Sequence, residues 1–193
     1  MLRDKGLILG ISFKRFRGKD TTADYLCYKY GFQKVAFADA LKEAAKSIFG
    51  LTQEQLYGNL KQARDPFWNR TPRELSQLLG TEAGRNIFGD DIWIKALYRK
   101  ISSYPKRNFV IPDARFLNEV KAVKSWGGYC IRIDRDITFD PSIDLHPSET
   151  ELDQYYDWDF IINNHKSIPN LQEEIDSVMV HISSKEGVPL TEA

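Results

Sequence analysis

The stretch that decides the fold is Gly6-Leu-Ile-Leu-Gly-Ile11, followed directly by Ser12-Phe-Lys-Arg-Phe-Arg-Gly-Lys-Asp-Thr-Thr22. The first six residues are almost all apolar, which is typical of a strand buried on both faces of a parallel sheet. Residues 12–18 break this pattern, and a helix-like segment runs from Lys19 to about Tyr30, where Gly31 is a good stop signal. We therefore predict a strand, a loop and a helix in direct succession.

The rest of the chain continues the alternation of strands and helices. Short apolar runs predict further strands at 32–37, 108–112, 129–133 and 160–162. Amphipathic segments and cap residues predict helices at 39–49, 71–87, 90–101, 115–126 and 168–182, with a frayed polar tail from Ser183. The alternation indicates an α/β fold in three layers, α/β/α, with a central parallel sheet between helices.

Two regions interrupt the alternation. Residues 50–105 hold several helices with no strand between them, and residues 134–157 are rich in Asp, Pro and Ser. We interpret each as an insertion that covers a ligand. Because neither a repeat nor a low-complexity linker divides the sequence, we expect one domain over residues 1–193.

Composition limits the partners and the location of this protein. The 193 residues include 27 Lys and Arg against 27 Asp and Glu, and this balance argues against a dedicated nucleic-acid binder, which needs a basic face. No apolar run approaches the ~18–20 residues of a membrane span. A signal-peptide core is also missing, and Cys27 and Cys130 suit a reducing compartment. We expect a cytoplasmic protein that binds neither membranes nor nucleic acid.

Residues 12–22 have the character of a phosphate-binding loop. A loop between a buried strand and a helix directs backbone N–H groups and the positive end of the helix dipole at one point. Gly18 lets the backbone approach phosphates, and Lys19 reaches the β- and γ-phosphates. Further positive charge comes from Lys14, Arg15 and Arg17.

The match to the P-loop template G-x-x-x-x-G-K-[ST] is incomplete. Phe13 stands where the template has its first glycine, and Asp20 stands where it has Ser or Thr. A basic surface turn before a helix is the alternative interpretation of the same residues.

Further motifs follow the loop in the chain. They are Gly18-Lys-Asp-Thr-Thr-Ala-Asp24, Ala36-Phe-Ala-Asp-Ala-Leu-Lys42, Thr71-Pro-Arg-Glu-Leu-Ser-Gln-Leu-Leu-Gly-Thr-Glu-Ala-Gly-Arg85 with Trp93, Val110-Ile-Pro-Asp-Ala-Arg-Phe-Leu-Asn-Glu119, Ile131-Arg-Ile-Asp-Arg135 and His146-Pro-Ser-Glu149. Together, over residues 6–165, they resemble the deoxynucleoside monophosphate kinases of phages and bacteria. G-K-D-T is the usual form in that family, so Asp20 is expected there, whereas Phe13 departs from it.

The resemblance implies a P-loop fold of the nucleoside-monophosphate-kinase type, with a helical substrate-binding insertion at 50–105 and a lid at 134–157. It implies transfer of the γ-phosphate of ATP to a deoxynucleoside monophosphate, with Mg²⁺. Such transfer needs positioning and positive charge. The implied catalytic residues are Lys19, Arg115 and Arg135. The implied ATP-binding residues are Lys14, Arg17, Gly18, Lys19, Asp20, Thr21, Thr22 and Arg132, with Thr21 and Asp20 serving Mg²⁺, directly or through water.

The resemblance also indicates where the acceptor nucleotide binds. Its candidate residues are Asp39, Lys42, Arg73, Gln77, Trp93, Asp113 and Arg115. Structural roles compete with several of these assignments: Asp39 as a helix cap, Trp93 as core, and Asp113 with Arg115 as an ion pair. Two lesser assignments complete the picture. Asn163 and Asn164 are candidates for the adenine, and a lid or structural role is assigned to His146, Ser148 and Glu149.

Other functions remain open on this sequence. A related P-loop kinase could act on another small phosphorylated metabolite, as phosphomevalonate kinases do, or the chain could be a non-catalytic nucleotide-binding module, which Phe13 favours. The base that is accepted is not encoded in any motif, and the family resemblance makes a homodimer reasonable.

Overall fold

The computed structural model describes residues 5–14, 17–135 and 150–187. Its contacts group the chain into two compact units, which we describe separately. The sheet unit comprises residues 1–36 and 101–193, and the helical unit comprises residues 37–100. The helical unit therefore begins before, and ends before, the region 50–105 that the sequence marks as helical.

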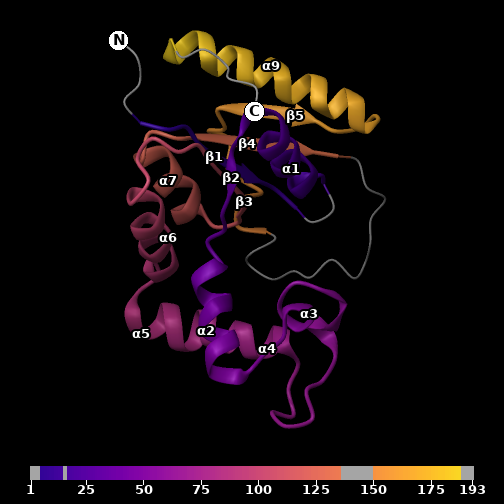
Figure 1. The fold of residues 1–193 in the computed structure, drawn as a ribbon, viewed down its shortest axis with the longest axis vertical. Coiled ribbons are helices and arrows are strands. Elements are labelled where there is room, and N and C mark those ends of the chain that lie inside the picture. Colours follow the sequence, from indigo (N-terminus) through magenta and orange to yellow (C-terminus); the bar gives the residue numbers. More distant parts are fainter. Residues whose placement is uncertain (1–4, 15–16, 136–149, 188–193) are drawn as a thin grey trace. The chain divides into compact units, whose positions relative to one another are not determined.

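The sheet unit contains five parallel strands (Figure 1). Their order is β2-β3-β1-β4-β5, and their bounds are β1 Ile8–Ser12, β2 Gln33–Lys34, β3 Phe109–Ala114, β4 Tyr129–Asp134 and β5 Phe160–Asn163. All five predicted strands are confirmed, although β2 is shorter than its predicted span. The register between β1 and β3 shifts between Gly10 and Ser12, where the chain leaves the sheet.

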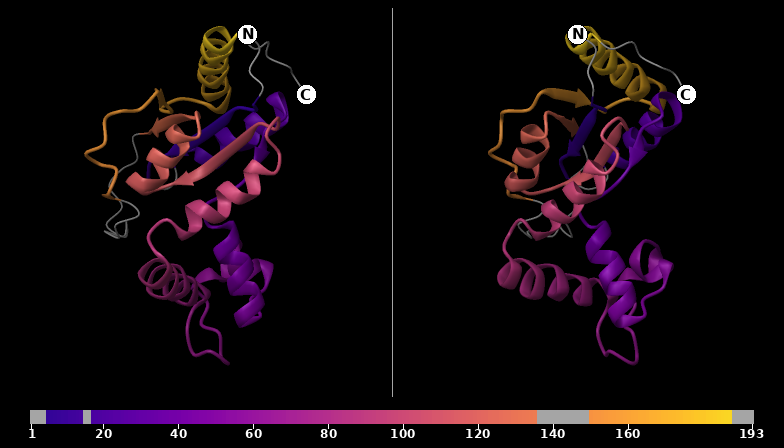
Figure 2. Two further views of the ribbon diagram at one scale, coloured as in Figure 1. Left: turned by 90° about the vertical axis from the view of Figure 1, so that its left-hand side faces the viewer. Right: turned by 60° about the vertical axis from the view of Figure 1, so that its left-hand side comes forward.

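Helices cover both faces of this sheet (Figures 1 and 2). They are α1 Lys19–Tyr30, α7 Leu117–Ser125 and α9 Ile168–Glu186. Side chains alternate along β1: Leu9 and Ile11 join the core beneath α1 and α9, whereas a Cβ on Gly10 would meet Val123 of α7. The predicted three-layer arrangement is confirmed, and α9 continues through Ser183 to Glu186, where the sequence predicts a frayed tail.

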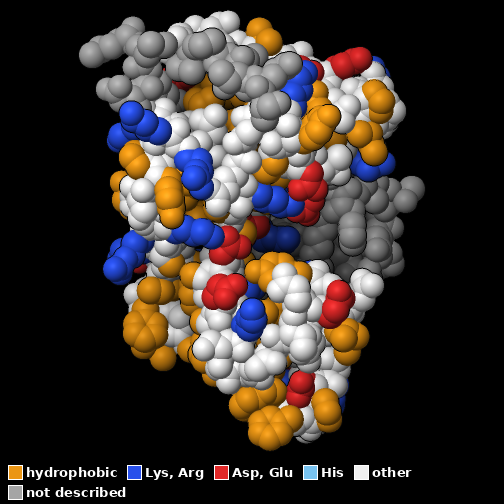
Figure 3. Space-filling model, in the orientation of Figure 1, with side chains coloured by type: hydrophobic (Ala, Val, Ile, Leu, Met, Phe, Trp, Pro, Cys, Tyr) orange, Lys and Arg blue, Asp and Glu red, His pale blue; other side chains and the backbone are white. Residues whose placement is uncertain are grey.

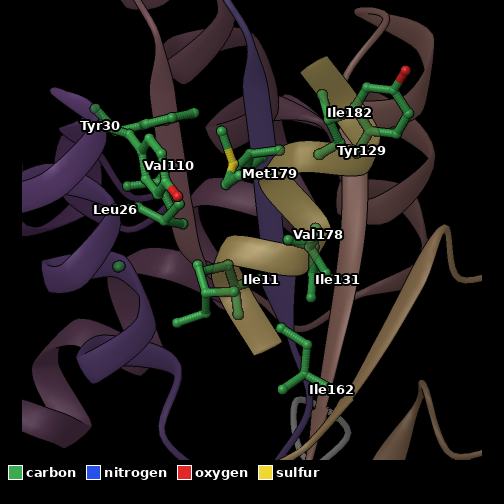
Figure 4. Close-up of a cluster of buried hydrophobic side chains, with 14 of the residues drawn as sticks. Ile11, Leu26, Tyr30, Val110, Tyr129, Ile131, Ile162, Val178, Met179 and Ile182 are labelled. Carbon is green, nitrogen blue, oxygen red and sulfur yellow. The ribbon is translucent and has the colours of Figure 1, made fainter. Parts of the chain in front are cut away.

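The main core lies between the sheet and the pair α1 and α9. Figure 4 shows Ile11, Val110, Ile131 and Ile162 of the strands together with side chains from both helices. Such fully buried aliphatic side chains contribute about 1.5–3 kcal/mol each. This core fixes the start of α1 against β1, and so fixes the two ends of the loop between them.

The helical unit consists of short helices. Their bounds are α2 Asp39–Phe49, α3 Gln53–Leu56, η1 Asn59–Gln62, α4 Pro72–Gln77, η2 Leu78–Arg85, α5 Asn86–Phe88 and α6 Ile92–Ser102, the last of which runs on into the sheet unit. Thr71 caps α4 as the sequence predicts, in a capping box with Glu74.

The single helix predicted at 71–87 is wrong in one respect, because its middle, η2, is a π-helix. Gly80 and Gly84 explain this, since glycine is a poor α-helix former and allows close approach. A Cβ on Gly80 would lie 2.9 Å from Leu41, and one on Gly84 would lie 2.7 Å from Trp93. The indole N–H of Trp93 also donates to the carbonyl of Gly80 at 2.9 Å.

Both basic and acidic side chains lie on the face of the molecule in Figure 3, with several of the basic ones toward its left-hand side. Among the described residues, no helix is both long and apolar enough to cross a membrane. Cys27 and Cys130 are both free thiols. Burial raises the pKa of Cys130 to about 12, so this side chain serves as an apolar part of the core.

Candidate functional site

The carboxyl edge of the sheet gathers strand ends around one loop. Ser12, the last residue of β1, is in register with Ala114 on β3 and with Arg132 on β4. Its hydroxyl donates to the carbonyl of Ala114 at 2.6 Å. The loop at 13–18 therefore leaves the sheet beside the segments that end β3 and β4, at the edge where open α/β sheets bind ligands.

Both ends of this loop have a left-handed backbone. Gly18 is the N-cap of α1, with φ 100° and ψ 14°, and Phe13 has φ 104°. Glycine adopts such φ values readily, whereas a residue with a side chain does so at a cost of about 1–3 kcal/mol. Phe13 stands where the P-loop template has glycine. The chain thus keeps a glycine-like backbone at this position without the glycine.

Lys19, the first residue of α1, is buried and only 7% exposed. Its ammonium donates to the carbonyl of Phe13 at 2.5 Å and to that of Lys14 at 2.6 Å. The side chain therefore turns back across the loop. Neutral carbonyls are weaker hydrogen-bond acceptors than phosphate oxygens. A phosphate bound at this loop would therefore replace the two carbonyls as the partner of the ammonium.

Asn164, which directly follows β5, fixes the loop from outside. Its buried side chain donates from Nδ2 to the carbonyl of Arg17 at 2.9 Å, and its backbone N–H donates to the carbonyl of Asp134 at 2.6 Å. A Cβ on Gly18 would lie 2.5 Å from this Nδ2. A larger residue at position 18 would therefore have an unfavourable φ and would also displace the Asn164 amide from its hydrogen bond with Arg17. The prediction that Asn163 and Asn164 contact adenine is not tested by this contact.

Cations surround the ring of Phe13. The guanidinium carbon of Arg132 lies 3.9 Å from the ring centroid, the Nζ of Lys14 lies 5.8 Å away, and the Cζ of Arg17 lies 6.0 Å away. These distances fall within the range of about 6 Å over which a ring attracts a cation. The Nε of Arg132 also forms an ion pair with Asp134 at 2.9 Å. Three of the predicted ATP-binding residues are thus brought together at the loop.

The loop has a further anchor that sequence reasoning missed. Lys14 forms an ion pair with Asp153 at 3.0 Å. The only local signal was the acidic composition of the segment that contains Asp153. The predicted catalytic residue Arg135 is exposed just after β4. Most of the predicted lid, together with Arg15, His146, Ser148 and Glu149, lies outside the described residues.

The first turn of α1 carries the predicted metal ligands. Thr21 is exposed, whereas Thr22 is fully buried and its hydroxyl has no hydrogen-bond partner among the described residues. The carboxylate of Asp20 pairs with Lys34 at 2.9 Å. Burial alone would lower the pKa of Lys34, but hydrogen bonds to Asp20 and Asp24 outweigh it and raise that pKa overall.

These residues fit a magnesium ion that is held mainly by substrate. The described part of the chain contains no cluster of three or more His, Cys, Asp and Glu side chains that could bind a metal. Mg²⁺ in phosphoryl-transfer sites uses one or two protein oxygens, and it completes its shell with water and phosphate oxygens. The exposed hydroxyl of Thr21 meets that requirement, and Asp20 does so through its second carboxylate oxygen or through water.

Two of the predicted acceptor-binding residues, Asp113 and Arg115, lie at the end of β3 and directly after it. Asp113 is half-buried within β3, and Arg115 follows the strand. The buried carboxylate of Glu119 accepts the backbone N–H of Arg115 at 2.8 Å and that of Phe116 at 3.1 Å. Glu119 thus supports Arg115 through the backbone at the start of α7.

The helical unit holds the remaining predicted acceptor residues. Asp39 pairs with Lys100 at 3.1 Å, and the Nζ of Lys42 lies 4.0 Å from the ring centroid of Tyr57. Trp93 packs against η2, in agreement with the structural role that the sequence left open.

Arg73 and Arg85 lie on different elements of the helical unit. Arg73 and Gln77 are on α4, and Arg85 ends η2, where it donates to the carbonyl of Asp90 at 3.3 Å. The substrate-binding role of Arg73 and Gln77, and of Asp39, Lys42 and Trp93, stays a prediction.

Comparisons with known proteins agree with one another. A family described as deoxynucleotide monophosphate kinase matches residues 68–175. A putative deoxynucleotide monophosphate kinase of Acanthamoeba polyphaga mimivirus is 35% identical over 197 residues, which cover 92% of this chain and 98% of that protein. The deoxynucleoside-5′-monophosphate kinase of Escherichia phage T5 is 29% identical over 114 residues, which are 54% of this chain but only 44% of that protein. The solved dephospho-CoA kinase from Campylobacter jejuni shares the fold, with a TM-score of 0.51, 18% identity and coverage of 92% and 97% of the two chains.

Proposed function

This chain belongs to the deoxynucleotide monophosphate kinase family of nucleotide kinases, and from that premise we propose that it transfers the γ-phosphate of ATP to a deoxynucleoside 5′-monophosphate. An oxygen of the acceptor phosphate bonds to the γ-phosphorus while the bond to the β-phosphate oxygen breaks. The products are ADP and a deoxynucleoside diphosphate. The observation that carries the proposal is the buried Lys19 ammonium, which spans a loop with left-handed ends at the carboxyl edge of the sheet.

The loop residues account for the donor side of the reaction. Charge on the transferred group is stabilised by cations that are already in place. Lys19 would exchange its carbonyl partners for oxygens of the β- and γ-phosphates, which are stronger acceptors. Lys14 and Arg17 belong to the same loop, and Arg132 lies against the ring of its first residue, Phe13. The first turn of α1 directs backbone N–H groups at this loop. Arg135 completes the set from the end of β4.

We assign Mg²⁺ to Thr21 and Asp20, on the fit described above. When bound, the ion would neutralise negative charge shared between neighbouring phosphates. We assign Thr22 to ATP binding only because it lies in the first turn of α1.

The acceptor side rests on Asp113 and Arg115 in the sheet unit, and on Asp39, Lys42, Arg73, Gln77 and Trp93 in the helical unit. Asp113 and Arg115 bind the acceptor nucleotide, and Arg115 also acts in catalysis. The catalytic set is then Lys19, Arg115 and Arg135. These roles come from the family resemblance, together with the position of each residue.

The cellular setting is also part of the proposal. A deoxynucleotide kinase supplies diphosphates for deoxynucleotide synthesis, so we place the protein in the cytoplasm, where free thiols such as Cys27 and Cys130 stay reduced. A homodimer is the expected assembly, and sedimentation of the purified protein would reveal it.

The test is release of ADP with dAMP, dCMP, dGMP and dTMP as separate acceptors, in the presence of ATP and Mg²⁺. We expect turnover with one or more of them. Lys19→Ala should lower kcat by about a hundredfold or more, because it removes charge that acts mainly on the transition state. Lys121→Ala, an exposed lysine on α7, is the matched control and should keep the wild-type rate.

Two results would contradict the proposal. Folded wild-type protein that releases no ADP with any of the four nucleotides would exclude this substrate class, and a panel with non-nucleotide phosphorylated acceptors would then identify a different kinase. ATP binding without turnover on either panel would indicate the non-catalytic module.

A further inference from the structure

Phe13 is the point at which this chain departs from its own loop motif. The backbone of Phe13 has a φ of 104°, which glycine would adopt without strain but a residue with a side chain adopts at a cost. Strained residues cluster where the surrounding structure uses them. The contacts of the ring indicate what that use is.

The ring holds Arg132 in one place. The guanidinium carbon of Arg132 lies 3.9 Å from the centroid of the Phe13 ring, much nearer than the Nζ of Lys14 at 5.8 Å or the Cζ of Arg17 at 6.0 Å. The Nε edge of the same guanidinium is fixed by Asp134 at 2.9 Å. A face on a ring and an edge on a carboxylate together determine the plane of an arginine fork. The side chain keeps 20% of its surface exposed, so it is reachable from solvent.

Phe13 and Arg132 belong to segments that only the fold brings together. Phe13 directly follows β1, and Arg132 lies on β4 in register with Ser12. The carbonyl of Phe13 also accepts from Lys19 at 2.5 Å. One residue thus contacts both a cation of the loop and a cation of the neighbouring strand.

We propose that Phe13 is a positioning residue for phosphoryl transfer, whose ring holds the Arg132 guanidinium at the phosphate loop so that its remaining N–H donors meet the donor phosphates already oriented. The inference rests on the proposed function and deepens it. A donor that needs no reorganisation during the reaction contributes more to the rate than one that must first be ordered. In this chain the first residue of the motif orients an arginine, a role that a glycine cannot have.

The ring could instead only fill space beside the loop, and the two interpretations predict different variants. If the ring positions Arg132, an apolar side chain without a π-face fails to replace it. Phe13→Leu should then lower kcat about tenfold, which corresponds to about 1.4 kcal/mol. Phe13→Tyr should stay near the wild-type rate. The KM for the acceptor nucleotide should not change in either variant. A space-filling ring predicts wild-type kcat for Phe13→Leu, and that result would overturn the proposal.

A double-mutant cycle tests the coupling directly. Arg132→Ala should lower kcat by about tenfold or more, and adding Phe13→Leu to it should cause no further loss, because the ring then has no guanidinium to hold. Losses that multiply in the double variant would show that Phe13 acts independently of Arg132. Arg132→Lys approaches the same contact from the other partner, since it keeps the charge but not the planar face. It serves if Phe13→Leu does not fold, and wild-type kcat for it would contradict the proposal.

A second aromatic–cation pair in the sheet unit provides the matched control. Tyr104 and Arg107 lie before β3, with the guanidinium carbon 4.7 Å from the ring centroid. Tyr104→Leu should leave kcat and both KM values unchanged. Thermal melting and circular dichroism of every variant separate lost folding from lost positioning.

The binding of a non-hydrolysable ATP analogue separates this inference from the proposed function. If the wild-type protein turns over no deoxynucleotide, the proposed function fails, and the same variants are compared by the Kd of the analogue. Weaker binding in Phe13→Leu and Arg132→Ala, without further loss in the double variant, would support Arg132 positioning at the phosphates. An equal Kd in all of them would overturn it.

Discussion

Phe13 and Gly18 stand at the two ends of one loop with nearly the same φ, 104° and 100°, yet only one of them is glycine. Their surroundings explain the difference. Beside Gly18, a Cβ would lie 2.5 Å from the Nδ2 of Asn164 and would displace that amide. Beside Phe13, the guanidinium of Arg132 lies against the ring. The same backbone conformation is thus obtained by excluding a side chain at one end and by using one at the other.

A glycine in a phosphate loop can satisfy two separate structural requirements. One requirement is the left-handed φ, which a larger residue meets at a cost of about 1–3 kcal/mol. The other is space, which a larger residue obtains only if a neighbouring side chain moves. At position 18 both the φ and the limited space favour glycine, whereas at position 13 only the φ does. Substitutions at the two ends of the loop can separate these requirements.

Gly18→Ala should have the largest effect. The new methyl group makes the left-handed φ of residue 18 unfavourable, and it also clashes with the side-chain amide of Asn164. The loop and this amide must therefore shift, and we expect kcat/KM to fall by about a hundredfold. Gly50→Ala is the matched control, because Gly50 ends α2 with φ 67° and a Cβ there would touch nothing within 4 Å. It should cost about 1–2 kcal/mol of unfolding free energy and leave kcat/KM unchanged. Equal activities for the two variants would show that space at position 18 is unimportant.

Asn164→Ala should have a smaller effect. It removes the hydrogen bond to the carbonyl of Arg17, so the unfolding free energy should fall by about 1–3 kcal/mol and kcat/KM by about tenfold. It also opens the space beside Gly18. The double variant Gly18→Ala with Asn164→Ala should therefore lose less activity than the product of the two single losses. Steady-state kinetics of the three variants measures this, and full multiplication of the losses would contradict the close contact.

Phe13→Gly and Phe13→Ala together measure the free-energy cost of the left-handed φ at position 13, because neither keeps the ring. Glycine is ordinarily about 0.5–1 kcal/mol less stabilising than alanine within an ordered segment. At position 13 the order should reverse, and the glycine variant should be the more stable by about 1 kcal/mol, because it alone relieves the strain. Ala44→Gly on α2 is the control, and it should show the ordinary order. Denaturant unfolding gives both differences, and the ordinary order at position 13 would mean that φ is not strained.

Asp176 is expected to have the smallest effect on the loop, because it lies at the far end of α1. This residue of α9 accepts from Tyr30 at 2.7 Å, from Lys29 at 2.8 Å and from Tyr25 at 3.0 Å. Burial would raise the pKa of Asp176, but these hydrogen bonds outweigh burial and lower it overall. A carboxyl with a lowered folded pKa stabilises the fold above its unfolded pKa, and this stability is lost as the pH falls through the folded pKa.

Asp176→Asn should therefore reduce the unfolding free energy by about 1 kcal/mol at pH 7 and by less at pH 3. Urea unfolding at the two pH values measures this difference. The kcat should stay at the wild-type value, because α1 keeps its N-terminal turn. A loss of kcat as large as that of Asn164→Ala would show that the loop depends on the whole of α1, and it would weaken the comparison between its two ends.

Most of the secondary structure could be predicted from patterns of residues that are close together in the sequence. The apolar run before the loop, the stop at Gly31 and the capping box at Thr71 all involve neighbouring residues, so β1, α1 and the start of α4 could be predicted. The π-helix η2 could not, because it depends on how Gly84 and Trp93 pack together. Likewise, the sequence shows Asp153 only as one more acid in a polar segment, although it pairs with Lys14.

The sequence by itself determined that a buried strand, a glycine–lysine loop and a helix follow one another, and that their composition suits phosphate. Tertiary structure alone decided how the loop is held: Asn164 contacts Arg17 from just beyond β5, and Arg132 contacts Phe13 from β4, both distant in the chain. The physical reason is the range of the interactions. Periodicity and caps act within a few residues, whereas the space beside a Cβ and the partner of a ring are set by segments that meet only after the sheet has formed.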